Sequence, residues 1–151
     1  NIRDSDGQTV LTFVANHWTL EYDLAYCGLG EEVYVAGILA KNDAAISEGK
    51  KSVADIKNTA RADFKKIAKS AGKDREVLCS QIYKLFHSGR ASKAIAAQYL
   101  ANALAAEGQA DDFSSAEFAK RLPPYVVAAI RHATGIGDSA VVADDTEAPN
   151  E

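Results

Sequence analysis

Apolar residues recur at helical spacing between Val53 and Ala71, and this stripe constrains the fold more than any other feature of the sequence. The stripe comprises Val53, Ile56, Ala60, Phe64, Ile67 and Ala71, whereas Lys57, Lys65, Lys66 and Lys69 fall outside it. One apolar face opposite a charged face is typical of a helix that packs against a core. The chain also contains 28 alanines, and alanine is the strongest helix former. We therefore predict a mostly helical fold.

Helix start and stop signals divide most of the remaining chain into further helices. Thr19 is placed to cap a short helix that ends near Gly28 or Gly30. Longer helices are predicted over about Glu31–Ile46, Lys51–Ser70, Asp74–His87, Ser92–Gly108, from Ser114 to the prolines at 123 and 124, and Tyr125–Thr134. The sequence therefore predicts about six to seven helices.

A single strand is predicted at Thr9–Ala15, where β-branched and aromatic residues cluster. The preceding segment, Asp4–Gly7, has the composition of a turn. Its two carboxylates are compatible with a magnesium ion, but a pair without further oxygen ligands is a weak signal, so we favour the turn. With the helices, this strand predicts the fold class as mostly α with a minor β part (α+β).

The modest net charge of −4 conceals a basic middle segment. Between Lys41 and Lys93 there are thirteen Lys and Arg against six Asp and Glu, a local balance of +7. A partner that carries phosphate would be attracted to such a segment. Solvated helix faces are the alternative explanation, and charge alone favours that alternative.

Several classes of protein are excluded by features that the sequence lacks. Neither a long apolar run nor the pattern of a signal peptide is present, so we predict no membrane span and no signal peptide. The two cysteines, Cys27 and Cys79, are too widely separated for a zinc knuckle and too few for a disulfide framework, which fits the reducing cytoplasm. Methionine is absent even at position 1, and we expect the chain to be a piece of a longer protein.

Two carboxylates and two cations are candidate functional residues. Glu21 and Asp23 follow the predicted strand and are compatible with a metal site, although both would also interact favourably with the dipole of a helix first turn. Lys93 and Arg90 lie at the start of a helix, where the dipole disfavours cations. Such an arrangement can bind phosphate, and a solvent-facing lysine is the alternative.

Three strings of residues resemble a known family: VLTFVANHWTLEYDLA at positions 10–25, SKAIAAQYLA at positions 92–101 and LPPYVVAAI at positions 122–130. They are similar to the C-terminal nuclease region of the overcoming-lysogenisation-defect (OLD) family of ATP-dependent endonucleases. In that family an ABC-type ATPase domain precedes a Toprim-type nuclease domain. The resemblance covers about residues 8–134 and implies the latter half of the nuclease region, with ATP bound only in a domain not present here.

The resemblance implies hydrolysis of phosphodiester bonds in DNA with two Mg²⁺ or Mn²⁺ ions. Glu21 matches an acidic residue that helps to hold the metal, and Asp23, in the same string, is assigned to the metal as well. Lys93 matches the lysine that acts next to the scissile phosphate. A Toprim site also has an earlier Glu and a D-x-D motif at the end of a strand, and Asp4–Asp6 resembles that motif only superficially. We therefore expect residues upstream of this chain to complete the metal site.

The resemblance also implies partners and a domain organisation. DNA would contact Arg90, Lys65 and Lys69, and the chain would associate with the rest of its parent polypeptide or with a second copy of itself. Residues 1–30 would be the end of a Toprim-like segment, namely the strand left from an α/β sheet, a metal-site loop and a short helix. Residues 31–136 would be a helical region sharing the same core, and residues 137–151 an acidic, disordered tail.

A second hypothesis comes from a different class of protein, a non-catalytic helical domain that binds nucleic acid or a protein partner. Under this hypothesis the Glu21 carboxylate interacts only with its own helix and the Lys93 ammonium is solvated. The two hypotheses differ in whether Glu21 and Lys93 turn toward one shared cleft. A capping carboxylate and a solvated lysine have no reason to converge.

Overall fold

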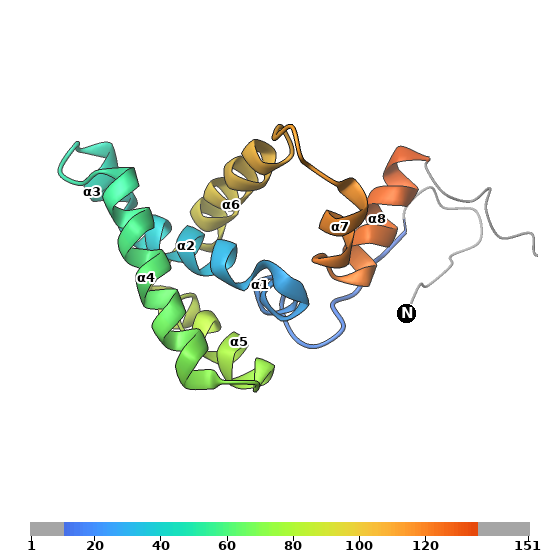
Figure 1. The fold of residues 1–151 in the computed structure, drawn as a ribbon, viewed down its shortest axis with the longest axis horizontal. Coiled ribbons are helices and arrows are strands. Elements are labelled where there is room, and N and C mark those ends of the chain that lie inside the picture. Colours follow the sequence, from blue (N-terminus) through green and yellow to red (C-terminus); the bar gives the residue numbers. More distant parts are fainter. Residues whose placement is uncertain (1–10, 136–151) are drawn as a thin grey trace, which may run out of the picture. The chain divides into compact units, whose positions relative to one another are not determined.

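The computed structural model describes residues 11–135 (Figure 1). These residues belong to two compact units, one formed by residues 15–123 and the other by residues 11–14 with 124–135. The larger unit contains α1 to α7, and α8 (Pro124–Thr134) belongs to the smaller one. The predicted turn at 4–7, the first two residues of the predicted strand and the predicted tail at 137–151 lie outside the described residues.

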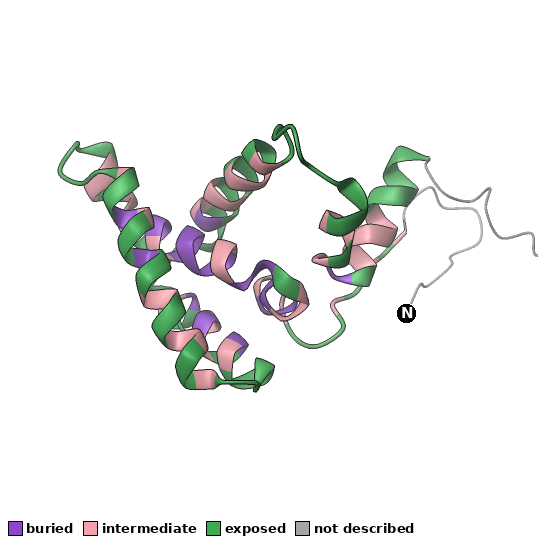
Figure 2. Ribbon diagram, viewed as in Figure 1, coloured by how far each residue is buried: buried purple, intermediate pink, exposed green. Residues whose placement is uncertain are grey.

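Helix α2 (Gly30–Lys41) is the centre of the larger unit. Its buried residues are Gly30, Val33, Tyr34, Val35, Ala36, Gly37, Leu39 and Ala40. A helix that is apolar all round must be surrounded by other elements. Accordingly, α2 packs against α4 (Val53–Ala71), α5 (Arg75–Tyr83) and α6 (Lys93–Glu107). Buried positions follow α2 along most of its length in Figure 2, whereas α4 is largely exposed.

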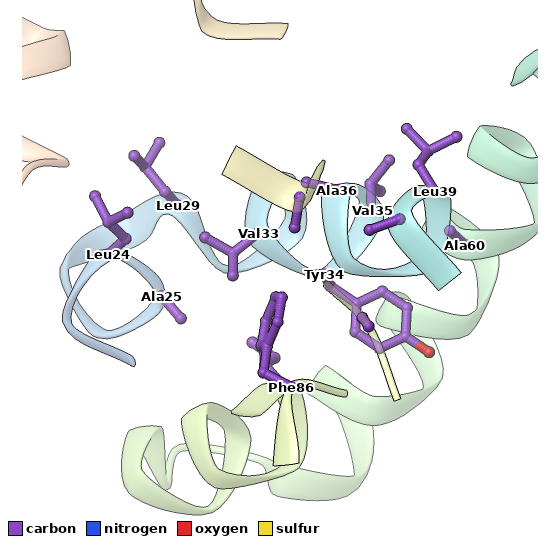
Figure 3. Close-up of a cluster of buried hydrophobic side chains, with 14 of the residues drawn as sticks. Leu24, Ala25, Leu29, Val33, Tyr34, Val35, Ala36, Leu39, Ala60 and Phe86 are labelled. Atoms are coloured by element: carbon purple, nitrogen blue, oxygen red, sulfur yellow. The ribbon is translucent and has the colours of Figure 1, made fainter. Parts of the chain in front are cut away.

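The apolar stripe of the long helix α4 lies where the sequence predicts it. Ile56 and Ala60 are buried, and Val53, Phe64 and Ile67 pack against the core. Figure 3 shows Ala60 of α4 beside the apolar side chains of α2. The prediction of a mostly helical fold is confirmed.

The predicted cap at Thr19 is confirmed, and the helices predicted to start at Asp74, Ser92 and Ser114 are capped in the same way. In each case a side-chain oxygen at the N-cap accepts a hydrogen bond from the backbone N–H three residues later, as capping requires. The pairs are Thr19 with Tyr22 at 3.4 Å, Asp74 with Val77 at 3.0 Å, Ser92 with Ile95 at 3.4 Å and Ser114 with Glu117 at 3.4 Å. They begin α1 (Leu20–Leu24), α5, α6 and α7 (Ser115–Lys120), respectively.

One predicted helix is divided in two. The sequence favours a continuous helix over Glu31–Ile46, but α2 ends at Lys41 and α3 (Asp43–Ser47) begins after Asn42. The Asn42 side chain donates a hydrogen bond to the Ile38 carbonyl at 2.8 Å. Asparagine side chains compete with backbone groups in this way, which favours a helix end over a helix interior.

The predicted strand is not found in its described part. Within residues 11–15, Thr12 makes a single β-bridge and the other residues have no regular structure. A strand is stable only when neighbouring strands satisfy its backbone groups, and the described residues form no sheet to which this segment could add. The strand in the predicted α+β fold class is therefore wrong for residues 11–15. Residues with high β propensity form a strand only where another strand pairs with them.

A kink joins α1 to α2. The regular helix of α1 ends at Leu24, a π-helical segment follows over Ala25–Leu29, and α2 begins at Gly30. Within this segment Gly28 has φ 136°, a conformation that side-chain-bearing residues rarely adopt. The sequence predicts a helix end near Gly28 or Gly30; regular α1 ends earlier, at Leu24, and the break in helical conformation lies at Gly28.

Among the residues that the structure describes, no helix combines the length and the apolar character needed to cross a membrane.

Candidate functional site

Glu21 and Lys93 converge although 72 residues separate them in the sequence. Glu21 is the second residue of α1 and Lys93 is the first residue of α6. The Lys93 ammonium donates to Glu21 Oε2 at 3.1 Å. The two side chains that the sequence singles out for metal and phosphate chemistry therefore face one another.

A small apolar pocket of about 60 Å³ lies beside this ion pair. Its walls come from α1, α2 and α6 and from Phe86, which follows α5. The lining residues are Leu20, Glu21, Leu24, Val33, Ala36, Phe86, Lys93, Ala96, Ala97 and Leu100. Glu21 and Lys93 are the only charged groups of this lining, so the pair occupies one polar edge of an otherwise apolar hollow.

The position of Lys93 explains why it needs a carboxylate. A cation at a helix start is repelled by the positive end of the helix dipole, and the Glu21 carboxylate offsets that repulsion. The Lys93 side chain is 46% exposed and that of Glu21 20% exposed. An ion pair so open to water contributes at most about 1 kcal/mol to the free energy of unfolding, so the pair is dispensable for folding.

Asp23 has a different environment from Glu21. It is only 1% exposed, and its carboxylate accepts hydrogen bonds from the backbone N–H groups of Asn16 at 2.8 Å, His17 at 3.4 Å and Trp18 at 3.4 Å. The His17 Nδ1 atom lies 3.4 Å from Asp23 Oδ1. Asp23, predicted from the family resemblance as a metal ligand, thus fastens the loop that precedes α1.

We predict that Asp23→Ala lowers the free energy of unfolding by about 1–3 kcal/mol, because backbone N–H groups lose a buried acceptor. Urea unfolding followed by circular dichroism measures the change. Asp63→Ala is the matched control, since the Asp63 carboxylate is 45% exposed and pairs with Lys66 on the surface of α4. Equal midpoints for the two variants would contradict a structural role for Asp23.

The predicted DNA-binding cations lie on the surface. Lys65 and Lys69 are exposed on α4, and Arg90 is exposed three residues before Lys93. No residue of α4 lines the pocket beside Glu21. The structure therefore brings Glu21 and Lys93 together and leaves Lys65 and Lys69 on a separate helix.

The fit of a divalent cation to this site is partial. Glu21 offers the carboxylate oxygen that Mg²⁺ and Mn²⁺ prefer. Within the described ranges, no three His, Cys, Asp or Glu side chains gather in a way that could hold a metal ion. Glu21 can therefore contribute one ligand, and further ligands have to come from elsewhere.

Neither cysteine has the character of a nucleophile. Cys79 is 2% exposed, and burial raises the pKa of its thiol to about 11. Burial also raises the pKa of the Cys27 thiol, with a further contribution from the nearby Asp23 carboxylate. Both groups remain protonated near neutral pH, whereas nucleophilic cysteines react as thiolates.

Two sets of side-chain contacts, one beside Lys93 and one around Arg121, have no local sequence signal. The Trp18 and Tyr83 rings are in contact, with their centroids 4.4 Å apart and their planes tilted by 44°, and the Lys93 ammonium lies 5.4 Å from the centroid of Tyr83. Arg121 forms ion pairs with both Glu32 and Glu107. These contacts join residues far apart in the sequence, and a single sequence carries no local signal for them.

Comparisons of the chain with protein-family models, with curated proteins and with solved structures find no match.

Proposed function

We propose that this chain carries part of a metal-dependent DNA endonuclease site of the OLD type, in which Glu21 is a metal ligand and Lys93 contacts the phosphate. The observation that carries the proposal is the 3.1 Å approach of the Lys93 ammonium to the Glu21 carboxylate. It pairs the oxygen donor and the cation that hydrolysis of a phosphodiester requires. The test is DNA cleavage by the complete protein with Glu21 or Lys93 replaced.

The ion pair is a resting arrangement of these two groups. When a phosphodiester enters, the Lys93 ammonium exchanges the Glu21 carboxylate for a phosphate oxygen, and one Glu21 oxygen becomes available to a cation. Lys93 then offsets the negative charge that develops on the phosphate in the transition state. Its place at the start of α6 adds the positive end of the helix dipole to the same region.

Glu21 is the part of the site that holds a divalent cation. A bound Mg²⁺ or Mn²⁺ would polarise the phosphate and activate the attacking water. Residues outside the described part of the chain, as the family resemblance implies, would provide the remaining ligands. Asp23 supports Glu21 indirectly in this proposal, because its carboxylate fixes the loop from which α1 begins.

The alternative function, a non-catalytic helical domain that binds nucleic acid or a protein, keeps one observation in its favour. The described residues supply a single carboxylate at the candidate site and no group of three metal ligands. In this alternative the Glu21–Lys93 pair only orients α1 against α6. Exchanging the two charges then preserves function, an outcome that the nuclease proposal excludes.

Phosphate contacts by the exposed cations have a measurable signature in the salt dependence of DNA binding. A plot of the logarithm of the binding constant against the logarithm of salt concentration has a negative slope, and each lysine or arginine that neutralises a phosphate makes it steeper by about 0.9. When Lys65, Lys69 and Arg90 are replaced by glutamine one at a time, we expect each replacement to make the slope shallower by about this amount. Fluorescence anisotropy of a labelled duplex at several salt concentrations measures it.

Lys120→Gln is the matched control for these substitutions. Lys120 is 70% exposed and pairs with Glu117 at 2.6 Å on the surface of α7. Lys120→Gln removes the same charge from a different helix. If the slope is unchanged in Lys120→Gln but shallower in the other three variants, Lys65, Lys69 and Arg90 contact DNA phosphates. If none of the variants changes the slope, Lys65, Lys69 and Arg90 do not contact DNA phosphates.

A further inference from the structure

An aromatic cluster lies between the Glu21–Lys93 pair and the start of α5. We define it as Trp18, Tyr22, Tyr26 and Tyr83. Trp18 lies 4.4 Å from Tyr83 and 6.0 Å from Tyr22, and Tyr22 lies 6.4 Å from Tyr26, all between ring centroids. The cluster brings together aromatic rings from the loop before α1, from α1, from the π-helical segment Ala25–Leu29 and from α5.

Trp18 is the open end of this cluster. Tyr22 is 9% exposed and belongs to the core, whereas Trp18 is 60% exposed. The exposed part of the Trp18 ring gains little from packing and is accessible to a ligand. The backbone N–H of Trp18 donates to the buried Asp23 carboxylate, which anchors the main chain at this residue. The Trp18 ring contacts Tyr83 at an interplanar angle of 44°.

Cations lie at two places on the cluster. The Lys93 ammonium is 5.4 Å from the ring centroid of Tyr83, and the Arg75 guanidinium is 5.9 Å from that of Tyr26. Aromatic faces combined with cations are the chemistry by which proteins bind single-stranded nucleic acid, the rings stacking on bases and the cations meeting phosphates. Paired bases in a duplex hide the faces that such rings would contact.

We propose that Trp18 and Tyr83 form a stacking platform for an unpaired nucleobase whose phosphate lies at Lys93. This inference rests on the proposed phosphate contact of Lys93 and specifies the substrate class, a DNA strand that is unpaired at the site. The exposed part of the Trp18 ring takes the base, and Tyr83 contacts the same ring, with the two planes tilted by 44°. Lys93, which contacts both Tyr83 and Glu21, connects the base platform to the candidate site.

The only tryptophan of the sequence is Trp18, so its fluorescence reports on this platform alone. The chain is titrated without metal, so that no cleavage occurs, with a short oligothymidylate, with an abasic oligonucleotide of the same length and charge, and with a blunt duplex. We expect thymidylate to quench Trp18 by stacking, and the abasic strand and the duplex to leave its emission nearly unchanged. Equal quenching by the thymidylate and abasic strands, or no quenching by any of them, overturns the proposal.

A second test measures the affinity of the variants for the labelled thymidylate and abasic strands. Trp18→Leu is expected to weaken thymidylate binding about 5- to 150-fold and to leave abasic-strand binding unchanged, since a base stacked on an aromatic ring is lost. Tyr83→Leu is the second variant, and it retains the fluorescent reporter. Phe113→Leu is the control, because Phe113 is 37% exposed in another loop and contacts Phe118. Equal weakening for both strands in Trp18→Leu and Tyr83→Leu overturns the proposal.

The platform and the nuclease proposal fail in different ways. Base-dependent quenching of Trp18 together with cleavage that is insensitive to Glu21→Ala and Lys93→Ala supports the platform and refutes the catalytic site. If Glu21→Ala and Lys93→Ala each abolish cleavage but Trp18 shows no base-dependent quenching, the catalytic site is supported and the platform is refuted.

Discussion

Lys93→Ala in the complete protein is expected to lower the rate of DNA cleavage by about 10²–10³-fold at every concentration of Mg²⁺ or Mn²⁺. The ammonium acts on charge that develops in the transition state, and loss of one such group has an effect of this size. Single-turnover cleavage of a labelled substrate measures the chemical step directly. The fold is expected to survive, because the Lys93 side chain is 46% exposed and its ion pair with Glu21 contributes little to stability.

Glu21→Ala should reduce cleavage in a different way. Because Glu21 is proposed to hold the metal, its loss weakens metal binding, and excess Mn²⁺ or Mg²⁺ should partly restore the rate. Excess metal should not rescue Lys93→Ala. This contrast separates the two roles without any assumption about the size of either effect.

The exchange of the two charges is the sharpest control. Glu21→Lys combined with Lys93→Glu retains an ion pair between α1 and α6 but removes the metal ligand and the phosphate contact from their positions. We expect the double variant to fold and to remain inactive. Restored cleavage, or unchanged cleavage in both single variants, would show that the pair only orients the helices.

Leu29→Ala is expected to lower the free energy of unfolding by about 2–5 kcal/mol, the largest effect on stability that we predict. Leu29 is 0% exposed in the segment between α1 and α2, and the substitution leaves a cavity where the side chain packs (Figure 3). Urea unfolding gives the change through the shift of the transition midpoint. A loss of this size is large against the usual stability of a domain.

Leu20→Ala is the matched control, because it removes the same atoms from the first residue of α1. Leu20 is 51% exposed, so its loss is expected to change the free energy of unfolding by about 0.5 kcal/mol or less. If the two variants unfold at the same urea concentration, the burial of Leu29 does not determine the stability of this region.

Local chemistry accounts for the parts of the fold that the sequence predicts well. Thr19, Asp74 and Ser92 each cap a helix through an N–H only three residues away, so the signal and its consequence lie in the same short segment. The stripe of α4 is equally local. The strand prediction at Thr9–Ala15 fails in its described part because pairing depends on distant residues, which β propensity does not include.

The candidate site shows the same division between local and distant information. Glu21 and Lys93 are identified by their positions after the predicted strand and at a helix start, and by a family resemblance. Their proximity comes from the packing of α1 and α6 on α2 and is not encoded in either string. Asp23 accepts hydrogen bonds from residues five to seven positions earlier, a spacing that belongs to no regular element. Its structural role is therefore invisible in the sequence.

The segment Ala25–Leu29 determines in which direction the Glu21 side chain of α1 faces relative to α2. Each residue of a helical segment adds rotation and rise along the chain, so deletion of one residue between Leu24 and Gly30 would change the direction in which Glu21 faces relative to α2. The Lys93 ammonium would then face a different side of α1, while the packing of α2 against α4 and α6 stayed intact. The pairing of Glu21 with Lys93 therefore depends on the length of this five-residue segment as well as on the two side chains themselves.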